Sequence, residues 1–164
     1  MTSGLRDSIQ DLRLIVDSLD TADGDLALAM GALRGRIEPQ LNDADLTLNW
    51  DVEVGGHDHS LGPRAILSIY RMIQEAAANA IRHANAEALD IIARWSRSDA
   101  LEIIISDDGD GIEPGRQPGR GVISMKNRAK DLGGSVETST AAGGVTLKIV
   151  IPAHPFSEGS TPAS

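Results

Sequence analysis

The segment from Ile73 to Ala84, read as IQEAAANAIRHA, combines one side that must be buried with one side that carries chemistry. At about 100° per residue of an α-helix, four polar or charged residues fall on one stripe: Glu75, Asn79, Arg82 and His83. The opposite side is apolar, with Ile66, Ile73, Ala77, Ala80 and Ala84. The pattern predicts a helix, opened by Pro63 and ending near His83 or Ala84, that packs one face on another layer.

A polar stripe on a helix is most often a solvated surface, and that is one interpretation of these four residues. The other interpretation is that they form one wall of a binding site. The choice depends on which other segments with chemistry the fold brings to this helix.

Composition limits the size of the fold and the class of ligand. The chain has 164 residues and is 41% hydrophobic, which suffices for one compact core but not for two full domains. Aromatic residues are only 2%, so aliphatic residues must fill this core. A formal charge of −9 argues against binding nucleic acid by bulk electrostatics, so an anionic ligand needs a local basic pocket.

Cysteine usage and hydropathy indicate the compartment. The chain has no cysteine, which excludes a disulfide scaffold and cysteine-based metal chemistry and fits a reducing compartment. No run of about 18 apolar residues occurs, so we expect no membrane span and no membrane contact. The apolar positions near the N-terminus are periodic, unlike those of a signal peptide. We therefore expect a cytoplasmic location for this chain, whose parent protein a membrane anchor elsewhere could hold at the membrane.

The two ends of the chain differ in pattern. Residues 4–19 carry apolar residues at alternating spacings of four and three, namely Leu5, Ile9, Leu12, Val16 and Leu19. This spacing fits a short coiled-coil seam and, equally, an amphipathic helix packed on a core. A second helix is expected from Asp25, as N-cap, to Leu41. Residues 154–164, rich in Ser, Pro and Gly, predict a disordered tail.

Between these ends the pattern alternates between strands and helices. Residues 46–54 alternate apolar and polar positions and predict a half-buried strand. Four further strands are expected in two hairpins, at 88–96 with 101–106 and at 134–140 with 145–151. Residues 107–120 predict a loop, and residues 121–132 predict a helix that ends at Gly133. Because strict βαβ alternation is missing, we expect an α+β sandwich with helices on one face of a mixed sheet.

A second segment with chemistry follows the strand 101–106. It reads Asp107-Asp108-Gly109-Asp110-Gly111. A carboxylate there can accept a hydrogen bond from a ligand amine, and the glycines let the backbone approach a ligand closely. The alternative is an ordinary Asp/Gly turn. A calcium-binding EF-hand loop is a poor fit because the glycine is misplaced and the twelfth position has no acid.

A third segment, beginning Gly119-Arg120-Gly121, opens the helix 121–132. Free backbone N–H groups and the helix dipole favour a phosphate at such a position, and Arg120 and Lys126 add positive charge. The segment lacks the GKS or GKT of a Walker A loop. It also follows a loop rather than a strand, unlike a Rossmann fingerprint.

In this order, E-x-x-x-N-x-x-R-H, D-x-G-x-G and G-x-G resemble the N, G1 and G2 boxes of the GHKL ATPases. This group comprises gyrase, Hsp90, histidine kinase and MutL proteins. EAAANAIRHANA, SDDGDGI and GRGVISMKNRAKDLGG are similar to the NarL/DesK-type sensor histidine kinases. The short loop between Gly111 and Gly119 matches their compact ATP lid. The resemblance covers about residues 20 to 152.

The resemblance implies a two-layer α/β sandwich, the Bergerat or GHKL fold. It implies a catalytic ATP-binding domain at residues 21–153. Residues 1–20 would be the end of a dimerisation and phosphoacceptor helical region, its second helix.

The resemblance also implies roles for the site residues. Asn79 would ligate a Mg²⁺ ion that bridges the ATP phosphates, and an amide oxygen suits this hard cation. Glu75 would be catalytic with Asn79 and would hold or polarise water near the metal. Asp108 would accept from the adenine amino group, with Gly109 and Gly111 allowing close approach.

The remaining implied nucleotide contacts belong to the phosphates, the lid and its hinge, and these residues are Arg82, His83, Gly119, Arg120, Gly121, Val122 and Lys126. Thr146 stands near the Gly-Thr position of the family, although here Val145 directly follows Gly144. Ser124 stands where the family often has glycine.

Kinases of this group phosphorylate a histidine on the first helix of a dimerising hairpin. The chain's histidines are His57, His59, His83 and His154, so none lies within 4–19. His57 and His59, in a Gly-flanked loop, are more often solvated than metal-bound. The implied partners are therefore an acceptor histidine helix on a separate segment, a response regulator, and a second copy in the full-length protein.

Three functions follow from these patterns. The first is the ATP-binding catalytic domain of a sensor histidine kinase. The second is a GHKL-fold module that senses nucleotide or binds a partner without turnover, suggested by the missing acceptor and by Val145. The third is an anti-sigma-factor serine kinase, which shares the fold but is disfavoured by the coiled-coil-like segment 4–19.

Overall fold

The computed structural model describes residues 26–55, 61–83, 85–141 and 143–153. The predicted helix 4–19, the N-cap Asp25, the histidines His57 and His59 and the tail 154–164 lie outside the described residues.

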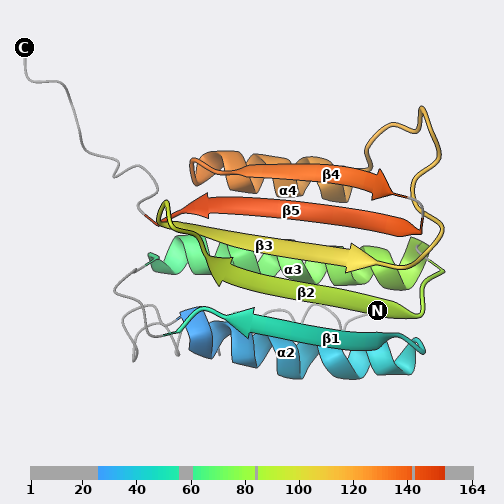
Figure 1. Ribbon diagram of the computed structural model, residues 1–164, viewed down its shortest axis with the longest axis horizontal. Helices are drawn as coiled ribbons and strands as arrows, with labels where there is room; N and C mark the ends of the chain where they lie inside the picture. Colours follow the sequence, from blue (N-terminus) through green and yellow to red (C-terminus); the bar gives the residue numbers. More distant parts are fainter. Residues whose placement is uncertain (1–25, 56–60, 84, 142, 154–164) are drawn as a thin grey trace, which may run out of the picture.

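In the described part of the chain, three helices alternate with five strands (Figure 1). In chain order they are α2 (Leu26–Asp43), β1 (Thr47–Glu53), α3 (Pro63–His83), β2 (Ala88–Trp95), β3 (Ala100–Asp107), α4 (Arg120–Asp131), β4 (Ser135–Ala141) and β5 (Gly144–Pro152). Each strand begins and ends within one residue of its predicted bounds. The predicted helix 63–83 and the end of α4 before Gly133, which has a φ of 73°, are confirmed.

The strands form one mixed sheet in the order β1-β2-β3-β5-β4. β1 pairs with β2 in parallel, and α3 is the crossover between them. The other pairs are antiparallel, including the two predicted hairpins β2–β3 and β4–β5. The predicted α+β class and mixed sheet are therefore confirmed, with a single βαβ unit at the β1 edge.

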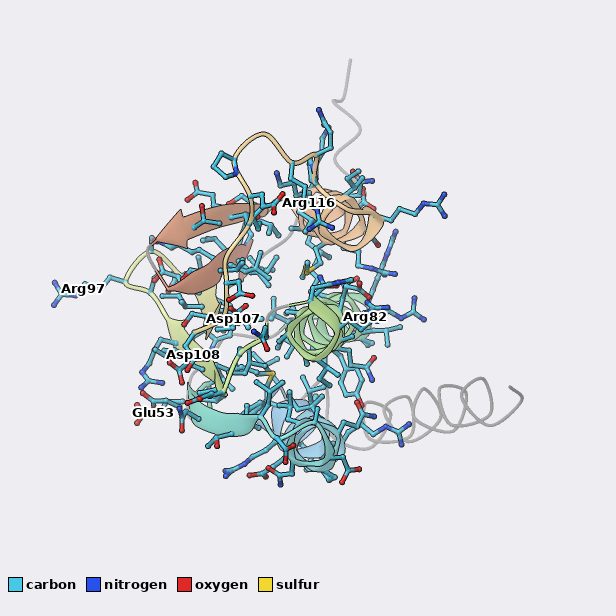
Figure 2. All side chains as sticks on the ribbon, turned by 90° about the vertical axis from the view of Figure 1, so that its right-hand side faces the viewer. Glu53, Arg82, Arg97, Asp107, Asp108 and Arg116 are labelled. Atoms are coloured by element: carbon cyan, nitrogen blue, oxygen red, sulfur yellow. The ribbon has the colours of Figure 1, made fainter. Side chains whose placement is uncertain are left out.

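All three described helices lie on the same face of the sheet, as Figures 1 and 2 show. Alternate residues of the central strands point into this helix layer and are buried, namely Leu89, Ile91 and Ala93 of β2, Leu101, Ile103 and Ile105 of β3, and Leu147, Ile149 and Ile151 of β5. The helices supply the matching aliphatic residues, and α3 adds small alanines such as Ala76 and Ala80. The core is thus a single aliphatic layer between the sheet and the helices.

The other face of the sheet is polar where β1 and β2 meet. Arg94 Nη2 lies 2.7 Å from Asp51 Oδ1, and Arg94 Nη1 donates to the Asp51 carbonyl at 2.9 Å. The hydrogen bond with the Asp51 side chain is the main cause of a raised pKa of Arg94, and the charge of Asp51 acts in the same direction. Asn49 donates to Asp90 across the same pair of strands at 2.6 Å. These cross-strand contacts stabilise the parallel edge of the sheet from its open side.

None of the described helices has both the length and the hydropathy that a membrane span requires.

The one-sided core makes opposite predictions for two neighbouring residues of β2. Ile91 is fully buried beneath the helices, whereas Ile92 is 37% exposed on the open face. We expect Ile91→Ala to lower the free energy of unfolding by about 2–5 kcal/mol, because it removes buried methyl groups and leaves a cavity. Ile92→Ala is the matched control and should cost less than about 1 kcal/mol. Urea denaturation of both variants measures the difference, and equal losses would contradict the one-sided core.

Candidate functional site

The polar stripe of α3 is held together by a contact between its own side chains. Arg82 Nη2 lies 3.4 Å from Glu75 Oε1 and donates to Asn79 Oδ1 at 3.3 Å. Glu75 and Asn79 are half-buried and Arg82 is exposed. The prediction that these three residues share one face is confirmed. The side-chain oxygens of Glu75 and Asn79 both face the guanidinium of Arg82.

The first turn of α4 packs directly on this stripe. A Cβ atom at Gly121 would meet Glu75 Oε1 and would lie 3.0 Å from Glu75 Cδ. Glycine is therefore the residue that allows α4 to approach α3 so closely. Because Glu75 Oε1 also contacts Arg82, one carboxylate oxygen joins the cation of α3 to the backbone of α4.

The N-terminus of α4 offers backbone donors without a side-chain cap. Gly119 is the N-cap, with φ −69° and ψ 170°, and it makes no side-chain hydrogen bond. The first bond within the helix runs from Ile123 N–H to the Gly119 carbonyl. The N–H groups of Arg120, Gly121 and Val122 have no partner in the described part of the chain, and the helix dipole makes this end favourable for an anion.

Two consecutive carboxylates at the end of β3 point in different directions. Asp107 pairs across the sheet with buried Leu89, so its side chain is on the helix-covered face. Asp107 Oδ1 accepts from the N–H of Gly109 at 3.0 Å and of Val145 at 3.3 Å. Its other carboxylate oxygen has no partner among the described residues. Asp107 is thus positioned with one free acceptor on the same side of the sheet as α3 (Figure 2).

Asp108 is exposed and is bound to the start of β2 instead. Its Oδ1 accepts from the N–H of Glu87 at 2.8 Å and of Ala88 at 3.0 Å. The hydrogen bonds from Ala88 and then Glu87 favour the charged form and lower the pKa of Asp108. This carboxylate fastens the loop after β3 to the first residues of β2.

The last hairpin closes over the backbone of Asp107. Gly144 has a φ of 137°, and a Cβ there would collide with the Asp107 carbonyl and lie 3.0 Å from its Oδ1. Only glycine fits this conformation and this close approach without strain. Gly109 is buried beside it, and Gly111 adopts a φ of 77°. The close approach seen here is made by Gly144 to the backbone of Asp107, and the predicted approach of Gly109 and Gly111 to a ligand stays a prediction.

Among the described residues, no side-chain hydrogen bond or ion pair joins the predicted site residues Thr146, Lys126, His83 and Arg120 to Asp107 or Glu75. Thr146 pairs with Ser106 and lies on the open face of the sheet, while Val145 is on the helix-covered face. Lys126 is exposed and lies about 140° around α4 from Gly121, at 100° per residue. His83 is exposed one turn after Asn79, and its side chain makes no hydrogen bond or ion pair within the described residues. Arg120 is exposed in the first turn of α4.

The site has few oxygen ligands for a metal. Among the described residues, no group of three or more His, Cys, Asp or Glu side chains could hold an ion. The oxygens of Asn79 and Glu75 are hard ligands that already face a cationic group, Arg82. They fit a divalent cation of the Mg²⁺ type, which uses one or two protein ligands together with water and phosphates.

Asp107 was not among the predicted site residues, although the sequence held two signals for it. In the spacing D-x-G-x-G, counting back from Gly111 and Gly109 gives Asp107 as the leading acid. Strand alternation also puts Asp107 on the same face of the strand as Ile105. Because Ile105 is apolar, this face is the one that the helices are expected to cover. The implied role of Asp108 is not tested by these contacts and stays a prediction.

Comparisons with known proteins agree with this geometry. The model of the "Histidine kinase-, DNA gyrase B-, and HSP90-like ATPase" family matches residues 65–155. The chain is 29% identical over 155 residues to the signal transduction histidine-protein kinase/phosphatase UhpB of Salmonella typhimurium, covering 93% of this chain and 29% of that protein. It is 30% identical to the sensor histidine kinase YxjM of Bacillus subtilis, covering 90% of this chain and 35% of YxjM.

Among solved structures, the histidine kinase domain of the Erythrobacter litoralis EL346 blue-light activated kinase superposes with a TM-score of 0.75. The sequence identity is 16%, over 93% of this chain and 76% of that one. This likeness shows the fold. The chain spans about a third of the length of the curated relatives it matches.

The contact between Gly121 and Glu75 generates a prediction for Gly121→Ala. The added methyl group meets the end of a flexible side chain, so we expect it to displace the Glu75 carboxylate from Arg82. The cost in unfolding free energy should stay below about 1 kcal/mol. A crystal structure of the variant measures the displacement. Gly35→Ala, in α2 with open space around it, is the control and should stabilise the protein by about 0.5–1 kcal/mol.

The lowered pKa of Asp108 generates a pH prediction. Because its pKa is lower in the folded than in the unfolded state, its stabilising contribution is complete above the unfolded pKa of about 3.9. That contribution is lost as the pH falls through the folded-state pKa. We expect wild type to be more stable than Asp108→Asn at pH 7, with the difference shrinking below about pH 4. Denaturation at several pH values measures it, and a difference that does not change with pH would refute this role.

Proposed function

The chain belongs to the histidine kinase-, DNA gyrase B- and HSP90-like ATPase family, and from this we propose that it is the ATP-binding catalytic domain of a sensor histidine kinase. The single observation that carries the proposal is the junction at Glu75, where α3, its cation and the first turn of α4 meet. Such a junction places oxygen ligands and free backbone donors beside each other, which a metal-bound polyphosphate needs.

At the metal end, Asn79 and Glu75 would hold Mg²⁺ with water and phosphate oxygens. The support is their present convergence on Arg82, which shows that the two side-chain oxygens can face one positive group. When bound, the ion would supply charge neutralisation of the phosphates. Arg82 would then turn to the phosphate oxygens, and His83 in the following position adds a second basic group near them.

At the phosphate end, the uncapped N–H groups of Arg120, Gly121 and Val122 would bind phosphate oxygens. The exposed Arg120 side chain adds positive charge at the same end of α4. Gly119 and Gly121 allow the backbone to turn into the helix beside Glu75. The loop 108–119, which has no helix or strand, would be the lid over the nucleotide (Figure 1).

At the base end, we assign the acceptor for the adenine amino group to Asp107 rather than Asp108. In both residues Oδ1 accepts two backbone N–H groups, but Asp107 lies on the helix-covered face of the sheet, whereas Asp108 is exposed and bonded to Glu87 and Ala88 at the start of β2. Gly144 packs against the backbone of Asp107, and Gly109 and Val145 hold its Oδ1, so the position of this carboxylate is fixed. Thr146 and Lys126 lie away from this cluster, so the proposal gives them no contact with the nucleotide.

In the proposed reaction, a histidine on a separate segment attacks the γ-phosphorus in line. A phosphorus–nitrogen bond forms at the imidazole as the bond to ADP breaks, and ADP leaves with its electron pair. Catalysis would rest on positioning and charge neutralisation. The phosphoryl group would pass to a response regulator, in a full-length protein that pairs with a second copy and works in the cytoplasm.

The alternative of a nucleotide-binding module without turnover rests on one observation. Val145 occupies the helix-covered position next to Asp107, where a hydroxyl side chain could have contacted the ligand. The two functions differ in phosphoryl transfer and agree in nucleotide binding.

Calorimetric titration with Mg·ATP and Mg·ITP tests the site. ITP lacks the exocyclic amine, so wild type should bind ATP more tightly. Asp107→Asn should weaken ATP binding by about 10–100-fold and remove this discrimination, because a charge-assisted hydrogen bond is lost. Asn79→Ala should make binding insensitive to Mg²⁺.

Asp108→Asn is the matched control and should keep the preference for ATP over ITP. Discrimination lost in Asp108→Asn and kept in Asp107→Asn would return the adenine contact to Asp108. If the folded wild type does not bind ATP, the proposed function fails.

A further inference from the structure

A groove of about 370 Å³ runs between α3 and α4 on the outer side of the helix layer. We call it the α3–α4 groove and define it by Arg71, Gln74, Glu75, Ser124, Met125 and Arg128. Its lining is mostly polar, and the buried Met125 and the half-buried Ala78 are its apolar members. Gln40 of α2 lies at its far side.

The groove carries two positive charges that have no partner. Arg71 and Arg128 are half-buried, and neither makes an ion pair or hydrogen bond within the described residues. The chain as a whole has a formal charge of −9. Each of these residues can lay its aliphatic stem along the groove while its unpaired guanidinium stays available to a carboxylate of a ligand. Two of them facing one groove indicate a ligand that brings its own carboxylates.

The groove is continuous with the proposed nucleotide site through Glu75. Arg71 precedes Glu75 by four residues, one helical turn, so both lie on one stripe of α3. On α4, Ser124 and Arg128 follow Gly121 on the same side, at spacings of three and seven. A segment lying in the groove would therefore reach the end of α4 where phosphates are proposed to bind.

From this we infer that the α3–α4 groove is the docking surface for the segment that presents the acceptor histidine, and that this segment is an acidic helix. The inference rests on the proposed function. A groove between two helices accepts a third helix by side-chain packing, and the half-buried Ala78 in its lining offers an apolar contact. Arg71 and Arg128 would bind carboxylates on either side of the histidine.

Charge also explains why the segment docks here and not elsewhere. An acidic helix is repelled by much of a surface of net negative charge and is attracted to a groove that holds two arginines without an ion pair among the described residues. The same groove would reject a basic helix. The two arginines would therefore set both the place and the identity of the partner.

The test uses the full chain and a designed 20-residue helical peptide. The peptide carries one histidine flanked by glutamates at helical spacing, and a matched peptide has glutamine at every glutamate. Binding is measured in the presence of Mg²⁺ and a non-hydrolysable ATP analogue, and transfer is measured with labelled ATP. The variants are Arg71→Glu, Arg128→Glu and, as matched control, Arg97→Glu. Arg97 is exposed in the β2–β3 turn, far from α3 (Figure 2).

We expect both groove variants to bind the acidic peptide about 10-fold or more weakly, since each loses a charge-assisted contact and gains repulsion. Phosphoryl transfer to the histidine of the peptide should fall in parallel in both groove variants, while their affinity for ATP stays unchanged. The Arg97→Glu variant should bind the peptide and transfer the phosphoryl group as the wild type does. The glutamine peptide should bind wild type weakly. Equal binding of both peptides, or equal transfer by all variants, overturns the docking surface. The docking surface is also overturned if the wild type binds ATP but does not bind the acidic peptide. If the wild type does not bind ATP, the proposed function itself fails, and this outcome is distinguishable from failure of the docking surface.

Discussion

The site depends on a single carboxylate oxygen, Oε1 of Glu75. It contacts the guanidinium of Arg82 within α3 and the backbone at Gly121 in α4. These are the two elements that a bound metal–nucleotide complex would have to share. One flexible side chain therefore links the Arg82 cation to the first turn of α4.

The sheet determines which groups can reach this centre. Side chains alternate between its two faces, so a shift of one residue moves a group from the helix layer to the open side. Asp107 and Asp108 are neighbours in sequence, and yet one faces the helix layer while the other fastens the loop to β2. Val145 and Thr146 divide in the same way on β5. The site is therefore selected by strand register, and residue type alone does not identify its members.

These two constraints separate what the sequence predicts well from what it predicts poorly. Periodicity located every described strand and helix closely, because the burial of alternate or every third and fourth residue is a local property. The convergence of Glu75, Asn79 and Arg82 was also predictable, because they lie on one helix. Thr146 and Asp108 were assigned roles through a resemblance of motifs, and those roles stay predictions; what the structure adds is the face of the sheet on which each residue lies. The close approach of Gly121 to Glu75 and the α3–α4 groove depend on helix packing, which local patterns do not contain.

The loop between β3 and α4 is held at both of its ends by contacts that do not involve its middle. At one end, Asp107 and Asp108 are bonded to β5 and β2. At the other end, Gly121 rests on Glu75. None of these contacts uses residues 112–118, and lengthening a loop whose ends are fixed costs little free energy. A change in the length or charge of this stretch therefore leaves the contacts that fix Asp107 and Gly121 in place. The chemistry of the loop is in this way separable from the geometry of its two anchors.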